Sequence, residues 1–104
     1  MSYDGEIEWH GRVVADIGNY TSNVEPMWRA ALGFPLSRTS GWPVRLAEFV
    51  FLHCAQVMVA NREEFEAMNP EDGWGDYDGA LRYVLRAAEM CAPYRDDAIV
   101  VWSV

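Results

Sequence analysis

The sequence contains no lysine, only two cysteines and two histidines, and no long apolar run free of polar residues. All eight basic residues are arginine, against 16 acidic residues, so the formal net charge of the 104-residue chain is −8. A protein that contacts several phosphates needs a basic surface. We therefore expect no direct binding to nucleic acid. The acidic surface keeps a small domain soluble, faces a basic partner or imitates nucleic acid.

The scarce cysteine and histidine residues form no recognisable catalytic or metal-binding pattern. Cys54 and Cys91 have the spacing of neither a zinc nor a redox motif. His53 and Cys54 are neighbours on a predicted helix, so their side chains point about 100° apart. His10 stands alone on an extended segment. We therefore expect no metal, no cofactor and no catalytic residue, and we favour a protein that is not an enzyme.

Two segments of the sequence indicate where in the cell the protein is located. The first six residues are polar and acidic, unlike a signal peptide. The most apolar stretch, residues 43–60, contains Arg45, Glu48, His53 and Gln56, which argues against a membrane span. We expect a cytoplasmic protein without membrane association, or one in the host cytoplasm if a phage encodes it.

The length and the 51% hydrophobic content indicate one domain, residues 1–104, with a sizeable core. Residues 6–9 and 12–15 are predicted to be extended, with a turn or bulge at His10-Gly11, and residues 98–104 to form a strand. Strands near both chain ends usually pair. The prediction is an α+β fold: a small two- or three-stranded sheet from the N- and C-terminal segments, packed with about four helical segments. An all-helical bundle with frayed ends is the alternative.

Helix signals divide the middle of the chain. A short helix is expected over residues 24–32, ended by Gly33, and a loop over 34–42. The longest helix is expected over residues 43–60, and its four polar residues lie in an arc of about 140°. The remaining positions are apolar, so we interpret it as a central helix mostly surrounded by protein.

Two further helices are expected. Asn61 and Glu64 match a capping box for a short helix that Asn69-Pro70 ends. Asp76 is the predicted N-cap of the last helix, which continues to about Cys91. Its inner face is predicted to contain Tyr77, Leu81, Val84, Leu85, Ala88 and Cys91. Its outer face is predicted to carry a charge ladder of Asp78, Arg82 and Arg86.

The first candidate site lies in residues 16–28, where turn-forming and cap-forming residues follow the predicted hairpin. Its polar side chains are Asp16, Asn19, Tyr20, Thr21, Ser22 and Asn23. An ordinary helix cap needs one or two such residues. The excess suggests a site for a polar ligand at a helix N-terminus, where backbone amides are free to donate. The alternative is an elaborate turn and cap.

The second candidate site is residues 73–77, where Trp74 stands between two glycines and precedes Asp76 and Tyr77. The glycines leave the indole free to stack on a ligand, or allow it to fold back on the core as a lid, which we favour. If Trp74 and Tyr77 lie beside residues 19–23, the two segments form one pocket with an aromatic wall and a polar floor.

Arginines are the only side chains available to neutralise an anion, and Arg29, Arg38 and Arg45 are the candidates. Surface ion pairs are the alternative role for these dispersed residues.

The segments Asn19-Tyr20-Thr21-x-Asn23-Val24-x-Pro26-Met27-Trp28, Met68-Asn69-Pro70 and Gly73-Trp74-Gly75-Asp76-Tyr77-x-Gly79-Ala80-Leu81 resemble a set of small bacterial and phage-encoded proteins. The resemblance covers residues 16–91 and carries no established activity. The missing lysines fit a high-GC genome, such as that of an actinobacterium or its phage. Small phage accessory proteins often bind a host protein or sequester a signalling nucleotide.

The sequence therefore predicts a non-enzymatic binding domain for a small polar or nucleotide-like ligand. The alternative is an acidic protein-interaction module or an inhibitor of a host factor. Self-association is left open. The predicted ligand-binding residues are Asp16, Asn19, Tyr20, Thr21, Asn23, Trp28, Arg29, Trp74, Asp76 and Tyr77.

Overall fold

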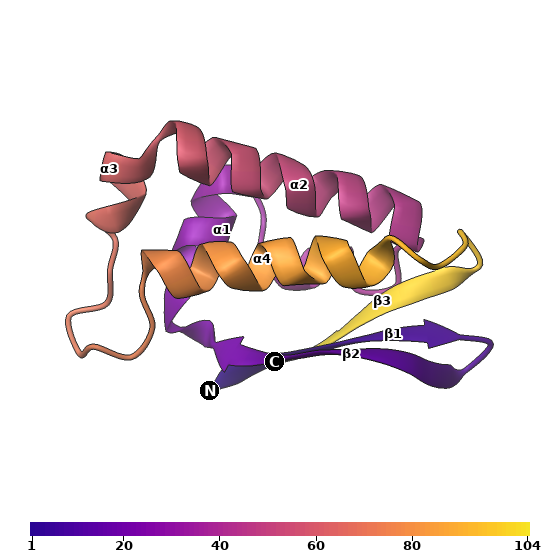
Figure 1. Cartoon of the computed structure of the whole chain (residues 1–104). Helices are drawn as coiled ribbons and strands as arrows, with labels where there is room; N and C mark the ends of the chain where they lie inside the picture. The colour runs from indigo at the N-terminus through magenta and orange to yellow at the C-terminus, as the bar shows by residue number, and fades with distance from the viewer.

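The chain starts with a β-hairpin, as the computed structural model of residues 1–104 shows (Figure 1). Strand β1 spans Ser2–Trp9 and strand β2 spans Arg12–Thr21. The turn between them is His10-Gly11, whose φ angles are 50° and 76°. Two positive φ angles are typical of a two-residue turn that matches the twist of an antiparallel pair. The predicted turn at these two residues is confirmed.

Strand β3, Ala98–Ser103, pairs antiparallel with β1 and completes a three-stranded sheet of order β2-β1-β3. The N-terminal strand is therefore central, and the C-terminal strand lies at one edge. Backbone bonds from Gly41 N to Val100 O (2.7 Å) and from Val100 N to Trp42 O (3.1 Å) cover part of that edge. The predicted α+β fold, with a sheet built from both ends of the chain, is confirmed.

Four α-helices and two short 3-10 helices follow the hairpin. Ser22–Val24 forms a 3-10 turn before α1, Glu25–Leu32, and Leu36–Thr39 forms another in the next loop. The remaining helices are α2, Val44–Ala60, α3, Arg62–Glu66, and α4, Tyr77–Cys91. Helices α2 and α4 lie side by side and run in opposite directions on one side of the sheet, with α1 behind them (Figure 1). No helix of the structure is both long and apolar enough to cross a membrane.

The core consists of large aromatic side chains between the sheet and these helices. Trp28 of α1 is fully buried and lies 5.2 Å from Tyr3 of β1 and 5.7 Å from Tyr83 of α4, measured between ring centroids. Trp102 of β3 covers Gly5 so closely that an added Cβ there would lie 2.3 Å from the indole. Aromatic burial on this scale dominates the stability of a small domain. It also fixes the sheet against the helices.

Residues 16–21 correct the prediction of a turn. β2 continues through them to Thr21, because β1 begins at Ser2 rather than at residue 6 and supplies partners for Asp16 and for residues 18–21, with a register shift at Ile17. The local turn chemistry is present: Asp16 Oδ1 accepts a hydrogen bond from Gly18 N at 2.8 Å, and Gly18 has a φ of 88°. Strand pairing satisfies the flanking backbone groups, so the bend remains a local irregularity within the strand.

Helix α2 begins and ends within one residue of its predicted bounds, but its environment was predicted wrongly. Leu46, Phe49, Leu52 and Val59 are 49%, 73%, 44% and 59% exposed, so protein covers only one side of α2. The helix lies in the outer layer of the domain (Figure 1).

Two smaller predictions about helices were also wrong. Asn61 does not cap α3; its Nδ2 donates instead to Val57 O at the end of α2, at 2.9 Å. Leu85 was placed on the inner face of α4 and is 40% exposed, because the buried surface of α4 is centred on Ala80, Tyr83, Val84 and Ala87. By contrast, Asp76 caps α4 as predicted, with Oδ1 accepting from Gly79 N at 2.7 Å.

The predicted outer charge ladder of α4 does not form. Asp78 pairs with Arg62 of α3 at 3.5 Å instead of with Arg82. Arg86 turns toward the sheet and donates from Nε to Ile17 O at 2.6 Å.

Candidate functional site: a polar depression at the end of strand β2

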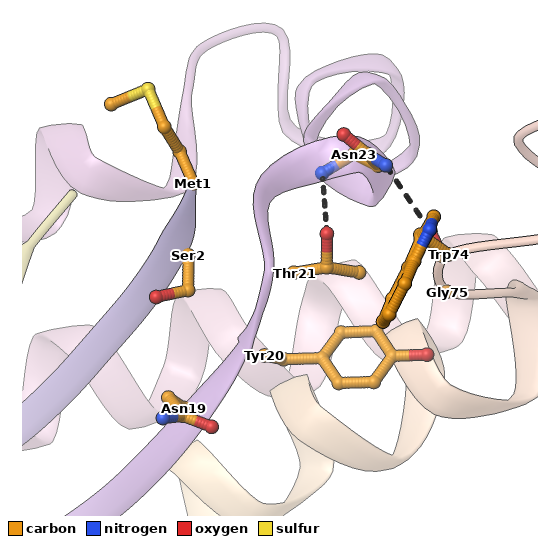
Figure 2. A pocket seen from close by; sticks show the side chains of 8 residues that line it. All are labelled: Met1, Ser2, Asn19, Tyr20, Thr21, Asn23, Trp74 and Gly75. Carbon is orange, nitrogen blue, oxygen red and sulfur yellow. Dashed lines mark hydrogen bonds between the residues drawn. The ribbon is translucent and has the colours of Figure 1, made fainter. Parts of the chain in front are cut away.

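The last residues of β2 present side chains toward the loop that contains Trp74. Tyr20 and Thr21 both extend from the strand toward Trp74 and Gly75, and Asn19 lies farther back along the strand (Figure 2). In the register of the sheet, Thr21 lies opposite Ser2, Tyr20 opposite Tyr3, and Asn19 opposite Asp4. The end of β2 is thereby held against the first residues of the chain.

The loop that contains Trp74 is fixed to this strand end. Asn23 Nδ2 donates to Asp72 Oδ2 at 3.2 Å and to the Trp74 carbonyl at 3.5 Å, and Asp72 Oδ1 accepts from Trp74 N at 3.0 Å. Gly75 has a φ of 89°, and an added Cβ would lie 2.5 Å from Thr21 Cγ2. Only glycine therefore permits so close an approach of the loop to β2.

Tyr20 joins the depression to the core. Its hydroxyl accepts a hydrogen bond from Asp76 N at 3.1 Å, and its ring stacks on Tyr83 with centroids 5.9 Å apart. Gly79 of α4 lies directly against it, since a Cβ there would be 1.9 Å from the Tyr20 hydroxyl. The close approach of α4 fixes the position of Tyr20.

These contacts create an open surface depression of about 680 Å³ (Figure 2). It is lined by Met1, Ser2, Asn19, Tyr20, Thr21, Asn23, Trp74 and Gly75. Figure 2 shows the side chains of β2 on one side and Trp74, from the loop before α4, on the other. Trp74 is 71% exposed, so the prediction that it covers the core as a lid is wrong.

The tertiary structure thus brings together five of the ten residues predicted as ligand-binding: Asn19, Tyr20, Thr21, Asn23 and Trp74. Two residues predicted with them belong to the core instead. Trp28 is fully buried and donates from Nε1 to Ala80 O at 3.1 Å. Tyr77 is 2% exposed and donates its hydroxyl to Met58 O at 2.8 Å. Neither ring is open to a ligand at this surface.

The other three predicted residues have structural partners outside the depression. Asp16 holds the bend at Gly18, and Asp76 caps α4. Arg29 lies one turn along α1 from Glu25 and pairs with it at 3.7 Å. None of the three lines the depression.

Sequence reasoning missed Met1, Ser2 and Gly75, which complete the lining. The first two were left outside the predicted strand, so their pairing with β2 was not foreseen. The alternation of Tyr3, Gly5 and Ile7, all of which are buried, is the signal that extends β1 to the start of the chain.

The depression is polar but carries no basic side chain. Its nearest charged group in the hydrogen-bond network is the Asp72 carboxylate, through Asn23. The side chains of Asn19 and Ser2 make no hydrogen bond within the chain, so their donors and acceptors face solvent. Such a surface is suited to hydrogen bonding and stacking rather than to neutralising an anion.

The reactive side chains are separate from this site and from one another. Cys54 and Cys91 are fully buried, and burial raises the pKa of each thiol to about 12, which disfavours the nucleophilic thiolate. His10 lies at the exposed tip of the hairpin, 3.8 Å from Asp97, so it forms no dyad with Cys54. No group of three or more potential ligands is arranged to hold a metal ion.

Comparison of the chain with protein-family models, curated proteins and solved structures found no match.

Proposed function

We propose that this protein is a non-enzymatic binding domain for a small uncharged molecule that combines a flat face with several hydroxyl or amide groups, as sugars and nucleosides do. The observation that carries the proposal is Trp74, an indole that is 71% exposed and held beside free polar side chains. Exposure of a large aromatic ring to water is unfavourable, and stacking on a flat ligand would remove one of its faces from water.

The polar groups around the indole suit such a ligand. Asn19 offers both a donor and an acceptor, and the Ser2 hydroxyl offers both as well. The Nδ2 group of Asn23 is engaged with Asp72 and Trp74, which leaves its carbonyl oxygen to accept. A sugar ring or a base stacked on Trp74 would place its polar edge among these groups.

The charges at the depression favour an uncharged ligand over an anionic one. No arginine lines the depression, and Arg29 is paired with Glu25 elsewhere. A phosphate would meet the field of a chain with net charge −8, and no arginine side chain lines the depression to compensate for it. The uncharged part of a nucleotide therefore fits better than its phosphate, which makes a sequestered signalling nucleotide a less favoured member of the class.

A titration of ¹⁵N-labelled protein with uncharged nucleosides and with mono- and disaccharides tests the proposal. We expect shifts of the Trp74 indole N–H and of the Asn19 and Asn23 side-chain amides. Because aromatic stacking contributes about 1–3 kcal/mol, Trp74→Ala should weaken binding about tenfold. Trp9→Ala is the matched control, since Trp9 is the other exposed tryptophan, at 42%, and does not line the depression.

The same titration compares adenosine with adenosine monophosphate, which differ by one phosphate group. Adenosine should bind at least as tightly as adenosine monophosphate. Shifts that lie outside the depression, equal binding by Trp74→Ala, or no shifts with any compound would each contradict the proposal.

A second candidate is an acidic protein-interaction module, including an inhibitor of a host factor. The face of the sheet opposite the helices is uncovered (Figure 1) and carries Asp4, Glu6 and Glu8 along β1, with Asp16 opposite Glu6 on β2. The hydrogen bond from Glu6 to Glu8 and the neighbouring negative charges raise the pKa of Glu6. A dense row of like charges favours a basic protein surface.

This candidate makes a different prediction. A partner captured on the immobilised protein should be lost at high salt and on reversing Glu6 and Glu8 to arginine. Reversal of Glu63 and Glu64 on α3 is the control with an equal change of charge. Capture that is insensitive to the sheet reversals would contradict it, and Trp74→Ala separates the two candidates because it should not affect this partner.

A further inference from the structure

The outer side of α2 and α4 leaves large apolar side chains in water. On α2, Phe49 is 73% exposed, Leu52 44% and Val59 59%, and Leu85 on α4 is 40% exposed. Phe49, Leu52, Gln56 and Val59 follow one another at spacings of three, four and three residues. At 100° per residue they lie in an arc of about 80°, which is the pattern of a helix-pairing seam. We call the surface formed by Phe49, Leu52, Gln56, Val59 and Leu85 the helical face.

The helical face is hollowed in two places. One hollow of about 410 Å³ is lined by Leu52, Ala55, Gln56, Val59, Ala60 and Leu85. The second, of about 270 Å³, is lined by Glu48, Leu52, Leu85, Ala88, Glu89 and Ala92. Leu52 and Leu85 line both hollows. The hollows therefore lie one after the other between the two helices, on either side of the Leu52–Leu85 pair.

We propose that the helical face binds the helical face of a second copy of this chain. The two-fold axis would lie in the interface and cross the helices at Leu52 and Leu85. Such an axis exchanges the two ends of each helix, so α2 faces the α2 of the second copy in the antiparallel direction. The contact is closed and self-complementary.

The shape of the helical face agrees with this symmetry. Phe49 lies three residues before Leu52, and the larger hollow extends from Leu52 to the residues after it. When the ends are exchanged, the protruding Phe49 of each copy meets the hollow beside Gln56 and Val59 of the other. A buried aromatic side chain in a pocket is the typical anchor of a stable interface.

The charges beside the face also agree with it. Arg82 lies three residues before Leu85 and Glu89 four residues after, and neither has an ion-pair partner within the chain. The same exchange of ends places Arg82 of one copy opposite Glu89 of the second copy, twice by symmetry. Two such pairs complement the apolar centre and fix its register.

Net charge explains why two copies would meet here rather than elsewhere. A chain of net charge −8 repels its copy, and the acidic row of the sheet would oppose like charges. The helical face is apolar and its flanking charges cancel. Its four large apolar side chains expose on the order of 400 Å², about half of the roughly 800 Å² per partner that a stable interface buries, so flanking residues must supply the remaining area.

Analytical ultracentrifugation of the full chain, from low micromolar to millimolar concentration, tests the proposal. We expect a monomer–dimer equilibrium. Phe49→Glu should weaken it about 100-fold, because it removes the anchor and buries a charge. Phe49 is 73% exposed, so this variant should keep its fold, which circular dichroism checks. Val13→Glu, at the 57% exposed Val13 of β2, is the matched control and should dimerise as the unaltered protein does.

A charge exchange tests the two-fold geometry. Arg82→Glu alone and Glu89→Arg alone should each weaken the dimer, and the double variant should restore it. Trp74→Ala should not change the dimer, so the result is independent of the ligand proposal. A monomer at every concentration, a dimer that survives Phe49→Glu, a double variant that is not restored, or a monomer that floats with phosphatidylcholine vesicles would each overturn it.

Discussion

Trp28 and Trp74 belong to the two motifs that the sequence joined into one candidate site, yet they lie in opposite environments. Trp28 is fully buried among Tyr3, Tyr83 and the backbone of α4, whereas Trp74 is 71% exposed above a polar depression. Tyr20 links the two regions. Its ring stacks on Tyr83 in the core, and its hydroxyl accepts a hydrogen bond from the backbone N–H of Asp76, which follows the Trp74 loop. A tryptophan in a polar segment is therefore not by itself a binding residue; its burial decides its role.

The largest expected effect separates the two tryptophans directly. Trp28→Ala should lower the free energy of unfolding by about 3–5 kcal/mol, because it leaves a large cavity and an unpaired Ala80 carbonyl. Trp74→Ala should change it by less than about 0.5 kcal/mol, as surface substitutions do. Urea unfolding measures both. Similar losses for the two variants would show that Trp74 also supports the core.

The next prediction concerns the link between the regions. Gly79→Ala should cost about 1–3 kcal/mol of unfolding free energy, since the new methyl group would lie 1.9 Å from the Tyr20 hydroxyl. Tyr20→Phe removes that hydroxyl and its bond to Asp76 N, at about 1 kcal/mol. The double variant should lose less than the sum of the two single losses. Additive losses would show that the hydroxyl adds nothing to the clash with the ring, whose Cζ atom would lie 2.4 Å from the methyl group in both backgrounds.

A smaller effect is expected at the junction between the loop that contains Trp74 and the start of helix α4. Asp76→Ala removes a side-chain cap of α4 and should cost about 1 kcal/mol. Asn61→Ala is the control at a position with the same sequence signal but no capping bond, so its loss should be smaller. Thermal unfolding of both variants compares them. Equal losses would mean that the cap geometry contributes nothing of its own.

The smallest effect lies on the open sheet face, away from both tryptophans. The raised pKa of Glu6 means that the folded chain holds this proton more strongly than the unfolded chain. Stability from this group is therefore present at low pH and falls as the pH rises from the ordinary glutamate pKa through the raised one. Glu6→Gln should remove that fall, an effect below about 0.5 kcal/mol at an exposed site.

Urea unfolding at a series of acidic pH values measures this change in slope. Glu71→Gln, which removes an exposed acid in the loop before Trp74, is the control and should keep the slope of the unaltered protein. A Glu6→Gln variant with that same slope would contradict the proposed interaction between Glu6 and Glu8.

Much of the fold could be predicted from the sequence, because turns, helix caps and helix faces depend on residues that are close together in the chain. Glycines at positive φ mark the hairpin turn and the end of α1, Asp76 marks the start of α4, and apolar periodicity gives the bounds of α2 and α4. These features depend on residues close in sequence. The strand after Asp16 was misread for the same reason: its turn formers are real, but a partner strand that starts at Ser2 outweighs them.

What the sequence determined by itself is an α+β architecture with paired chain ends, a net negative charge and two polar–aromatic segments. Only the tertiary structure decided which aromatic rings are buried, that Asn19, Thr21 and Asn23 line one depression with Trp74, about 50 residues away in the chain, and that one side of α2 faces solvent. Periodicity shows that a side chain lies on a given face of its element, but the packing of distant elements determines whether anything covers that face.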